Sequence, residues 1–201
     1  IMYNITSKTA LIVIDTQNEY FSEDGNLYTE NAKRCTSNIN NIINMFRSNN
    51  MEIIYVKHMH KRDGSNVGRM GDFDATPIFI EGSNGAKIYE EISVTTEDTI
   101  IYKDRYSSFV GTGLHELLRS KGIDTVVITG LMTNFCCLST AFSASDMDYK
   151  TIMVIDAVEG PDLPDLGYGS ISQDTIKKVV ASTLLFGVAE VADTETLLNR
   201  G

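Results

Sequence analysis

The sequence has few cysteines, few prolines and no long apolar run. Three cysteines among 201 residues, without C-x-x-C spacing, argue against a disulfide framework, a zinc knuckle and a thioredoxin-like site. The start of the chain lacks the basic and apolar regions of a signal peptide, and no apolar run approaches the about 20 residues that cross a bilayer. These absences predict a cytoplasmic protein with reduced thiols and no membrane partner.

Positive charge is also scarce. Seventeen basic residues face 27 acidic ones, for a formal net charge of −10. A nucleic-acid-binding protein needs a basic surface, and the densest basic run, 57–62, is followed at once by Asp63 and is typical of a solvated loop. We therefore expect no nucleic-acid partner and a small diffusible molecule as the ligand. The hydrophobic content of 42% supports one core in a single domain, residues 1–201.

Short apolar runs alternate with amphipathic segments along the chain. This alternation predicts a doubly wound, mainly parallel six-stranded sheet between two helical layers, a Rossmann-like α/β/α sandwich. The intervening segment 59–97 lacks periodicity, and we expect it to cover the substrate or contact another subunit. The expected strands are 10–15, 52–58, 98–103, 124–130, 150–157 and 188–193, and the expected helices are 31–48, 114–122, 133–146 and 171–187.

Three reactive residues fall at one edge of the predicted sheet. Asp15 ends the first strand, Lys103 ends the third, and Cys136 begins the helix after the fourth. Ligands bind beyond the carboxyl ends of parallel strands, so these side chains are expected to meet there. Each residue also has an ordinary structural interpretation: Asp15 as a loop cap, Lys103 as a surface partner of Asp104, and Cys136 as a small buried side chain.

The helix start gives Cys136 a chemical interpretation. A helix N-terminus and a nearby lysine are expected to lower the pKa of a thiol, and the same N–H groups can hold an oxyanion. The neighbouring Cys137 points about 100° away and is expected to pack in the core.

Three separated motifs resemble the isochorismatase-like cysteine hydrolase superfamily. They are DTQNEYF from Asp15, KDRYSSF from Lys103, and GLMTNFC ending at Cys136, and the resemblance spans about residues 10–191. It implies that these three residues are catalytic and that a small linear amide is cleaved at its C–N bond through a covalent cysteine intermediate, with release of ammonia. It also implies a cis peptide at Leu131–Met132 and an oxyanion hole formed by the N–H groups of Met132 and Cys136.

The stretch from His58 to Asp74 is most similar to the branch that contains N-carbamoylsarcosine amidase and ureidoacrylate amidohydrolase. This branch uses no metal or cofactor, and its members form dimers or tetramers. Because such substrates carry a carboxylate, Arg69 and Arg105 are candidates to bind it. The other candidate substrate-binding residues are Asn18, His58, Tyr106, Phe109 and Asn134.

Other functions remain open on the sequence. In nicotinamidases of the superfamily, a metal site with an aspartate and histidines follows the second strand; His58 and His60 stand there, but Lys57 replaces an acidic partner. A histidine pair at the pocket rim is the simpler interpretation. A catalytically inactive oligomeric binding protein is another alternative. A haloacid-dehalogenase-like phosphotransferase would need D-x-D, and Gln17 occupies the second position. True isochorismatases have no nucleophilic cysteine, so the retained Cys136 argues against that activity.

Overall fold

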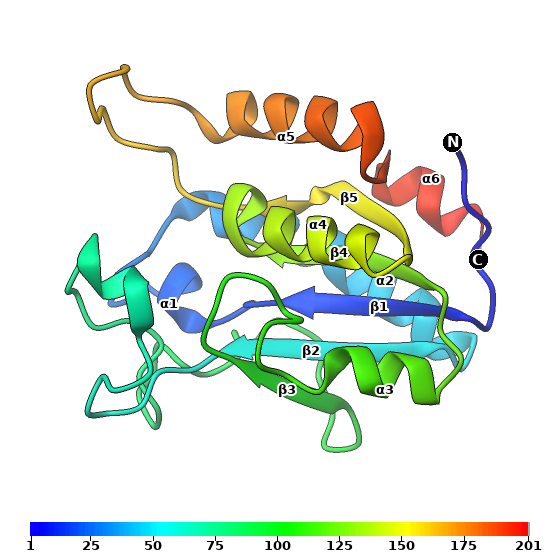
Figure 1. Ribbon diagram of the computed structural model, residues 1–201, viewed down its shortest axis with the longest axis horizontal. Coiled ribbons are helices and arrows are strands. Elements are labelled where there is room, and N and C mark those ends of the chain that lie inside the picture. Colours follow the sequence, from blue (N-terminus) through cyan, green and yellow to red (C-terminus); the bar gives the residue numbers. More distant parts are fainter. Residues whose placement is uncertain (201) are drawn as a thin grey trace.

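The computed structural model describes residues 1–200, and its centre is a six-stranded sheet. The strand order is β3-β2-β1-β4-β5-β6 and every neighbouring pair is parallel, which confirms the predicted doubly wound sheet. All carboxyl ends therefore lie at one edge, on the left in Figure 1. The strands are β1 Thr9–Ile14, β2 Glu52–His58, β3 Thr99–Lys103, β4 Thr125–Leu131, β5 Lys150–Glu159 and β6 Glu190–Ala192.

The helices differ in detail from those predicted. The segment expected as one helix over 31–48 divides into a 3-10 helix and α2, and the helix expected over 133–146 begins with a π-helical turn, η3. The α-helices are α1 Asn18–Phe21, α2 Thr36–Ser48, α3 Leu114–Ser120, α4 Leu138–Asp146, α5 Gln173–Gly187 and α6 Thr194–Leu198; the 3-10 helices are η1 Glu30–Cys35 and η2 Gly68–Asp72, and η3 covers Thr133–Cys137. None of the helices in the described part of the chain is long and apolar enough to cross a membrane.

Alternate residues of the central strands supply two separate cores. Ile12 and Ile14 of β1 face α3, α4 and α5, whereas Leu11 and Val13 face α2 and α6. Because successive side chains of a strand point to opposite faces, a continuous apolar strand needs helices on both sides. The three layers are visible in Figure 1, with α3, α4 and α5 on the near side of the sheet and α2 behind it.

A glycine lets β4 approach the end of β1. Gly130 has φ +114°, and a Cβ at this position would lie 1.9 Å from the carbonyl oxygen of Ile14. Any larger residue would therefore push the two strands apart. The pairing of β4 with β5 also shifts register between Ile128 and Gly130. The end of β4 therefore lies close to Ile14, the residue before Asp15.

The segment between β2 and β3 gathers at the carboxyl edge of the sheet (Figure 1). Isolated bridges join Gln17 to Ile88 and His60 to Ile80, so the segment is tied to the ends of β1 and β2. Buried Glu19 accepts hydrogen bonds from the N–H groups of Asn26 and Phe79. The segment is thus held over the place where the reactive residues were expected.

Candidate active site

Asp15, Lys103 and Cys136 meet where β1 and β3 end and where the turn η3 follows β4. Asp15 directly follows β1 and adopts φ +50°, a left-handed conformation that aspartate tolerates better than most residues. The Nζ atom of Lys103 lies 2.8 Å from Oδ2 of Asp15 and 3.2 Å from Sγ of Cys136. The lysine therefore touches both the carboxylate and the sulfur, as expected at the carboxyl edge of this sheet.

The carboxylate and ammonium groups are both fully removed from solvent. Burial raises the pKa of Asp15, although Lys103 acts in the opposite direction. Burial alone would lower the pKa of Lys103, but Asp15 and Cys136 raise it above its ordinary value. Lys103 is therefore a permanent cation at neutral pH, and its charge compensates that of Asp15.

The thiol of Cys136 differs from the sequence-based expectation. Burial raises its pKa to about 12, and Lys103, which lowers it, does not compensate. Cys136 is 3% exposed, so desolvation of a thiolate outweighs the favourable charge of the lysine. In the resting protein Cys136 is thus a neutral thiol with a carboxylate base within reach: one oxygen of Asp15 lies within 4.8 Å of its sulfur.

The loop that carries Cys136 is shaped by its backbone. The peptide bond between Leu131 and Met132 is cis, at the position implied by the resemblance. The carbonyl oxygen of Met132 accepts the N–H groups of Phe135 and Cys137, which closes the π-helical turn η3. Cys137 is fully buried in the core, as expected, and burial raises its pKa well above the ordinary range.

His58 and His60 are held by hydrogen bonds on both ring nitrogens. Nδ1 of His58 lies 3.0 Å from Nζ of Lys103, and its Nε2 lies 2.9 Å from Nε2 of His60. Nδ1 of His60 lies 3.0 Å from the carbonyl oxygen of Ile78. These nitrogens have partners already, so the pair does not fit the metal site considered for nicotinamidase-type chemistry.

Asp15, His58 and Cys136 also have the spacing of metal ligands, with donor atoms within 4.8 Å of one another. Nζ of Lys103 lies within 3.2 Å of all three donor groups. The ammonium group therefore occupies the place that a metal ion would need, and these residues do not fit a metal either.

Two hollows lie beside the reactive residues. The larger, of about 720 Å³, runs between η2 and α4, and the smaller lies along η3 and α4. Both are lined by Tyr106, Ser139 and Ser143, and the ring of Tyr106 contacts that of Phe135 with centroids 5.4 Å apart. Phe135, which lines the smaller hollow, immediately precedes Cys136, and Arg105, which lines the larger one, lies two residues after Lys103.

The other candidate substrate residues are distributed unevenly. Arg69 and Arg105 line the larger hollow and Asn134 lines the smaller one. Asn18 contacts Asn84 at the edge of the long segment. Phe109 instead lies in the core, 5% exposed and stacked on Tyr149, because its ring completes the packing of α3 against the sheet.

Sequence reasoning missed the buried residues that support the site. The side chain of Gln17 donates to the carbonyl of His58 and accepts the N–H of the same residue, so it fixes the end of β2 beside β1. Phe79, with φ +52°, stacks on the ring of His58. The D-x-Q pattern was a usable signal for Gln17; Phe79 had none, because its role depends on a left-handed loop.

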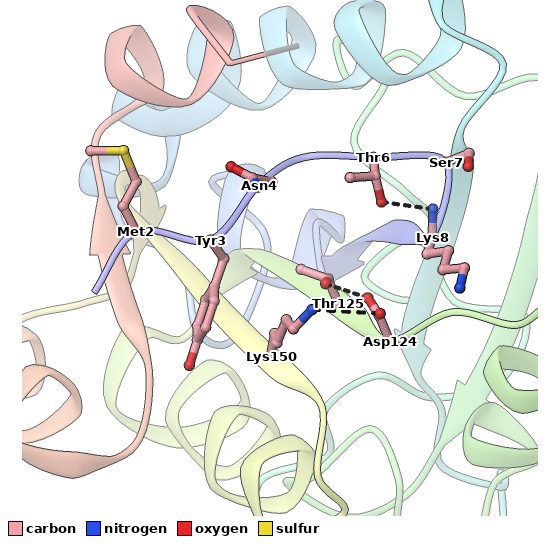
Figure 2. Close-up of a pocket in the computed structure, with 9 residues that line it drawn as sticks. All are labelled: Met2, Tyr3, Asn4, Thr6, Ser7, Lys8, Asp124, Thr125 and Lys150. Carbon is pink, nitrogen blue, oxygen red and sulfur yellow. Dashed lines mark hydrogen bonds and ion pairs between the residues drawn. The ribbon is translucent and has the colours of Figure 1, made fainter.

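A further hollow lies at the opposite edge of the sheet (Figure 2). It is formed by residues before β1 and by the starts of β4 and β5, where Lys150 pairs with Asp124 at 3.6 Å. The amino ends of the strands surround it, so it is separated from Cys136 by the length of the sheet.

Known proteins are similar to this chain in sequence and in fold. The isochorismatase domain model matches residues 9–173. A probable inactive nicotinamidase of Arabidopsis thaliana is 29% identical over 168 residues, covering 81% of this chain and 86% of that protein. A cysteine hydrolase from Pseudomonas syringae pv. phaseolicola 1448A superposes with TM-score 0.96 at 28% identity, covering 100% of this chain and 95% of the other.

An amidase structure is also similar. N-carbamoylsarcosine amidase from Thermoplasma acidophilum superposes with TM-score 0.73 at 29% identity, covering 93% of this chain and 96% of that one. The family model spans most of the chain, and the strand order and helical layers agree with the fold predicted from the alternation of apolar and amphipathic segments. The chain belongs to the isochorismatase family of hydrolases.

Proposed function

We propose that this protein is an amidohydrolase that cleaves the C–N bond of a small linear amide or an N-carbamoyl or ureido compound, with Cys136 as the nucleophile. The observation that carries the proposal is the position of the Lys103 ammonium group, 2.8 Å from the Asp15 carboxylate and 3.2 Å from the Cys136 sulfur. A nucleophile beside a base that a third group holds in place is the arrangement of covalent catalysis.

The first step transfers the thiol proton to Asp15 as sulfur attacks the substrate carbonyl. A neutral thiol requires such a base, because burial holds the pKa of Cys136 at about 12. The N–H groups of Met132 and Cys136 stabilise the oxyanion of the tetrahedral intermediate. Lys103 remains charged throughout and balances first the carboxylate and then the developing charge on sulfur.

The second step releases ammonia. Asp15 returns its proton to the leaving nitrogen, the C–N bond breaks, and a thioacyl or thiocarbamoyl enzyme remains. Water then attacks with Asp15 as base, which breaks the C–S bond and restores the thiol. An amide and one water thus yield a carboxylic acid and ammonia; a ureido compound yields a carbamate, which decomposes to an amine and carbon dioxide.

The larger hollow supplies a site for a substrate carboxylate. Nη1 of Arg105 donates to the carbonyl oxygens of Asn66 and Asp104, which fixes the guanidinium group at the wall of the hollow. Gly68 packs against this group, since a Cβ there would lie 2.8 Å from its Cζ. Arg69 and Arg105 each pair with an aspartate, Asp72 and Asp104, but Arg69 is 93% exposed and Arg105 only 43%. Because Arg105 is the more buried and the better fixed of the two, we assign the carboxylate to it.

Ammonia release from a panel of amides and ureas tests the proposal. Cys136→Ala is expected to lower the rate of ammonia release at least about 1,000-fold, while the circular dichroism spectrum stays native. The matched control is Cys137→Ala, which changes the neighbouring buried thiol and should retain most activity. The same activity in wild type and Cys136→Ala would exclude a cysteine nucleophile.

An inactive binding protein is the competing proposal. It is favoured by the 3% exposure of Cys136 and by the similarity to a probable inactive nicotinamidase. This proposal predicts that no amide in the panel releases ammonia and that iodoacetamide does not modify Cys136 faster than Cys137. As a hydrolase, the protein should be modified at Cys136 faster than at Cys137, because Asp15 lies within reach to take the thiol proton, and mass spectrometry would locate the modification.

The remaining parts of the proposal concern assembly and location. We propose a homo-oligomer in the cytoplasm, consistent with three free cysteines and with exposed aromatic rings at Phe142 and Tyr106 beside the hollows. Sedimentation equilibrium would test the assembly.

A further inference from the structure

Behind the candidate nucleophile, four groups form a continuous chain of hydrogen bonds. Nζ of Lys103 lies 3.0 Å from Nδ1 of His58, Nε2 of His58 lies 2.9 Å from Nε2 of His60, and Nδ1 of His60 lies 3.0 Å from the carbonyl oxygen of Ile78. His58 and His60 are 2% and 1% exposed, so water does not substitute for these partners.

The two ends of this chain of hydrogen bonds require the same direction of donation along it, from Lys103 toward Ile78. An ammonium group has no lone pair, so Lys103 must donate and Nδ1 of His58 must accept. A neutral His58 then carries its proton on Nε2 and donates to His60, which in turn carries its proton on Nδ1. At the other end, the carbonyl of Ile78 can only accept, which independently requires the same tautomer of His60.

Both histidines remain neutral in this arrangement. Burial, followed by the charge of Lys103, lowers the pKa of His58, and burial lowers that of His60. A second proton on His58 would place two N–H donors against each other at Lys103. The tautomers are therefore locked by geometry as well as by desolvation.

The end of the hydrogen-bond chain at Ile78 is anchored within the long segment between β2 and β3. Phe79 stacks on His58 with ring centroids 4.9 Å apart, and its carbonyl accepts the N–H of His60. The N–H of Phe79 donates to buried Glu19, and a Cβ on Gly85 would lie 2.3 Å from that carboxylate. Neither Ile78 nor His60 can move without disturbing these contacts.

We propose that His58 and His60 form a one-way hydrogen-bond relay that positions the ammonium group of Lys103 between Asp15 and Cys136. This inference rests on the proposed hydrolase function for its kinetic consequence but not for its geometry. Neither histidine acts on substrate in this role. His60 acts only by holding His58 in the tautomer that accepts from Lys103.

The relay supplies one of three hydrogen-bond partners of Lys103. The partners are Nδ1 of His58, the carbonyl oxygen of Arg105 and the sulfur of Cys136, and the sulfur, at 3.2 Å, is the most distant. Two acceptors at 3.0 Å, together with the ion pair to Asp15 at 2.8 Å, hold the ammonium group in place, so the sulfur meets a charge whose position is already set. The groups that face Lys103 are Asp15 after β1, His58 of β2, Cys136 of η3 and the carbonyl of Arg105 after β3. The charge of Arg105 and the phenol of Tyr106 act on this cluster from farther away.

Nitrogen-15 NMR of the histidine side chains tests the relay without a substrate. The chain has three histidines, so the His60→Gln and His115→Gln variants assign the spectrum. We expect His58 as the Nε2–H tautomer and His60 as the Nδ1–H tautomer, unchanged from about pH 6 to about pH 8. An Nδ1–H tautomer of His58, or protonation of either ring in this interval, would overturn the proposal.

Two substitutions of His60 test its consequence. His60→Gln keeps an acceptor for His58, whereas His60→Leu removes it. For ammonia release, His60→Leu should lower kcat about tenfold with KM nearly unchanged, and shift the acid limb of the pH profile to higher pH, because a displaced Lys103 stabilises the Asp15 carboxylate less. His60→Gln should stay within about threefold of wild type.

The outcomes separate this proposal from the proposed function. Equal kinetic losses and unmoved acid limbs in the two variants would reduce His60 to a structural residue and overturn the relay. If wild type releases no ammonia from any substrate, the proposed function fails, and the tautomers measured by NMR still decide whether the relay exists.

Discussion

At the scale of single residues, the site buries a carboxylate, an ammonium group and a thiol in mutual contact. Asp15 and Lys103 compensate each other, so neither is an isolated buried charge. The thiol cannot ionise by itself in this environment, since burial raises its pKa to about 12. In the proposed mechanism the reactive unit is therefore the thiol together with its base, and activity depends on the protonation state of Asp15.

The first prediction concerns pH. Burial raises the pKa of Asp15 above its ordinary value, so the ionised base is lost as pH falls through this raised value. We expect the acid limb of kcat/KM for ammonia release to lie above about pH 4, the ordinary range of an aspartate. Asp15→Asn, which cannot accept the proton, should lower kcat at least about 100-fold at every pH. An acid limb at or below the ordinary aspartate pKa would contradict this role.

The second prediction concerns the substrate carboxylate. Arg105→Gln removes the guanidinium group at the wall of the larger hollow and should raise KM about tenfold or more for an N-carbamoyl amino acid, but little for a neutral amide. Arg69→Gln is the control, because Arg69 lines the same hollow yet is 93% exposed. If Arg69→Gln gave the larger increase, the carboxylate would be assigned to the wrong arginine.

At the scale of elements, the site depends on how closely β4 approaches β1. The left-handed Gly130, whose Cβ position lies 1.9 Å from the oxygen of Ile14, places the turn with Cys136 beside Asp15. The helix after β4 was predicted from its small residues, but its π-helical first turn was not. That turn depends on the carbonyl of Met132 and on Gln173 of α5, which donates to Thr133.

The third prediction tests whether the close contact between β4 and β1 requires glycine at position 130. Gly130→Ala should lower the free energy of unfolding by at least about 3 kcal/mol, since it adds both backbone strain and a backbone clash. Urea titration measures the change. Gly113→Ala is the control, because Gly113 has open space around its Cβ position, and its change should stay below about 1 kcal/mol. Similar losses in both variants would indicate that the approach of β4 to β1 is not constrained.

At the scale of the whole molecule, the sheet order brings distant segments to one edge. Strands β1 and β4 are neighbours although more than 100 residues separate them. The connection from β1 to β2 contains α2 on one face of the sheet, and the connection from β4 to β5 contains α4 on the other face. Crossing from one layer to the other at this point leaves a crevice beyond the strand ends, where Asp15 and Cys136 meet.

The fourth prediction concerns the stability of this whole structure in alkali. Burial raises the pKa of Cys35 and of Cys136 to about 12, whereas unfolded thiols ionise near the ordinary value of 9.0. A raised folded pKa gives stability that is present below the unfolded value and lost as pH rises above it. We therefore expect each buried thiol to reduce the free energy of unfolding by up to about 1.4 kcal/mol per pH unit above about pH 9.

Urea unfolding at intervals between about pH 8 and about pH 10 measures this loss. Cys35→Ala removes one buried thiol from the core on the other face of the sheet from Cys136, so its alkaline slope should be smaller than that of wild type. At about pH 8 the variant should be less stable than wild type because of the cavity it creates, and this difference should shrink as pH rises. An unchanged slope would show that Cys35 ionises in the folded protein.

The order of strands and helices, their two-sided burial and the three reactive residues could all be predicted from the sequence. Continuous apolar runs such as 10–15 require two covering layers, and the carboxyl ends of parallel strands share one edge. The sequence thus determined the fold class and the meeting of Asp15, Lys103 and Cys136 at one edge of the sheet.

Only the tertiary structure decided the protonation of these residues and their supports. The pKa of Cys136 depends on how completely the surrounding layers exclude water, and no local pattern encodes that. Likewise, His58 and His60 stood two residues apart in the sequence, but their tautomers depend on Lys103 on one side and on a carbonyl from the long segment on the other. Spacing along the chain selects which residues can meet, while packing determines which atoms face each other and in what state.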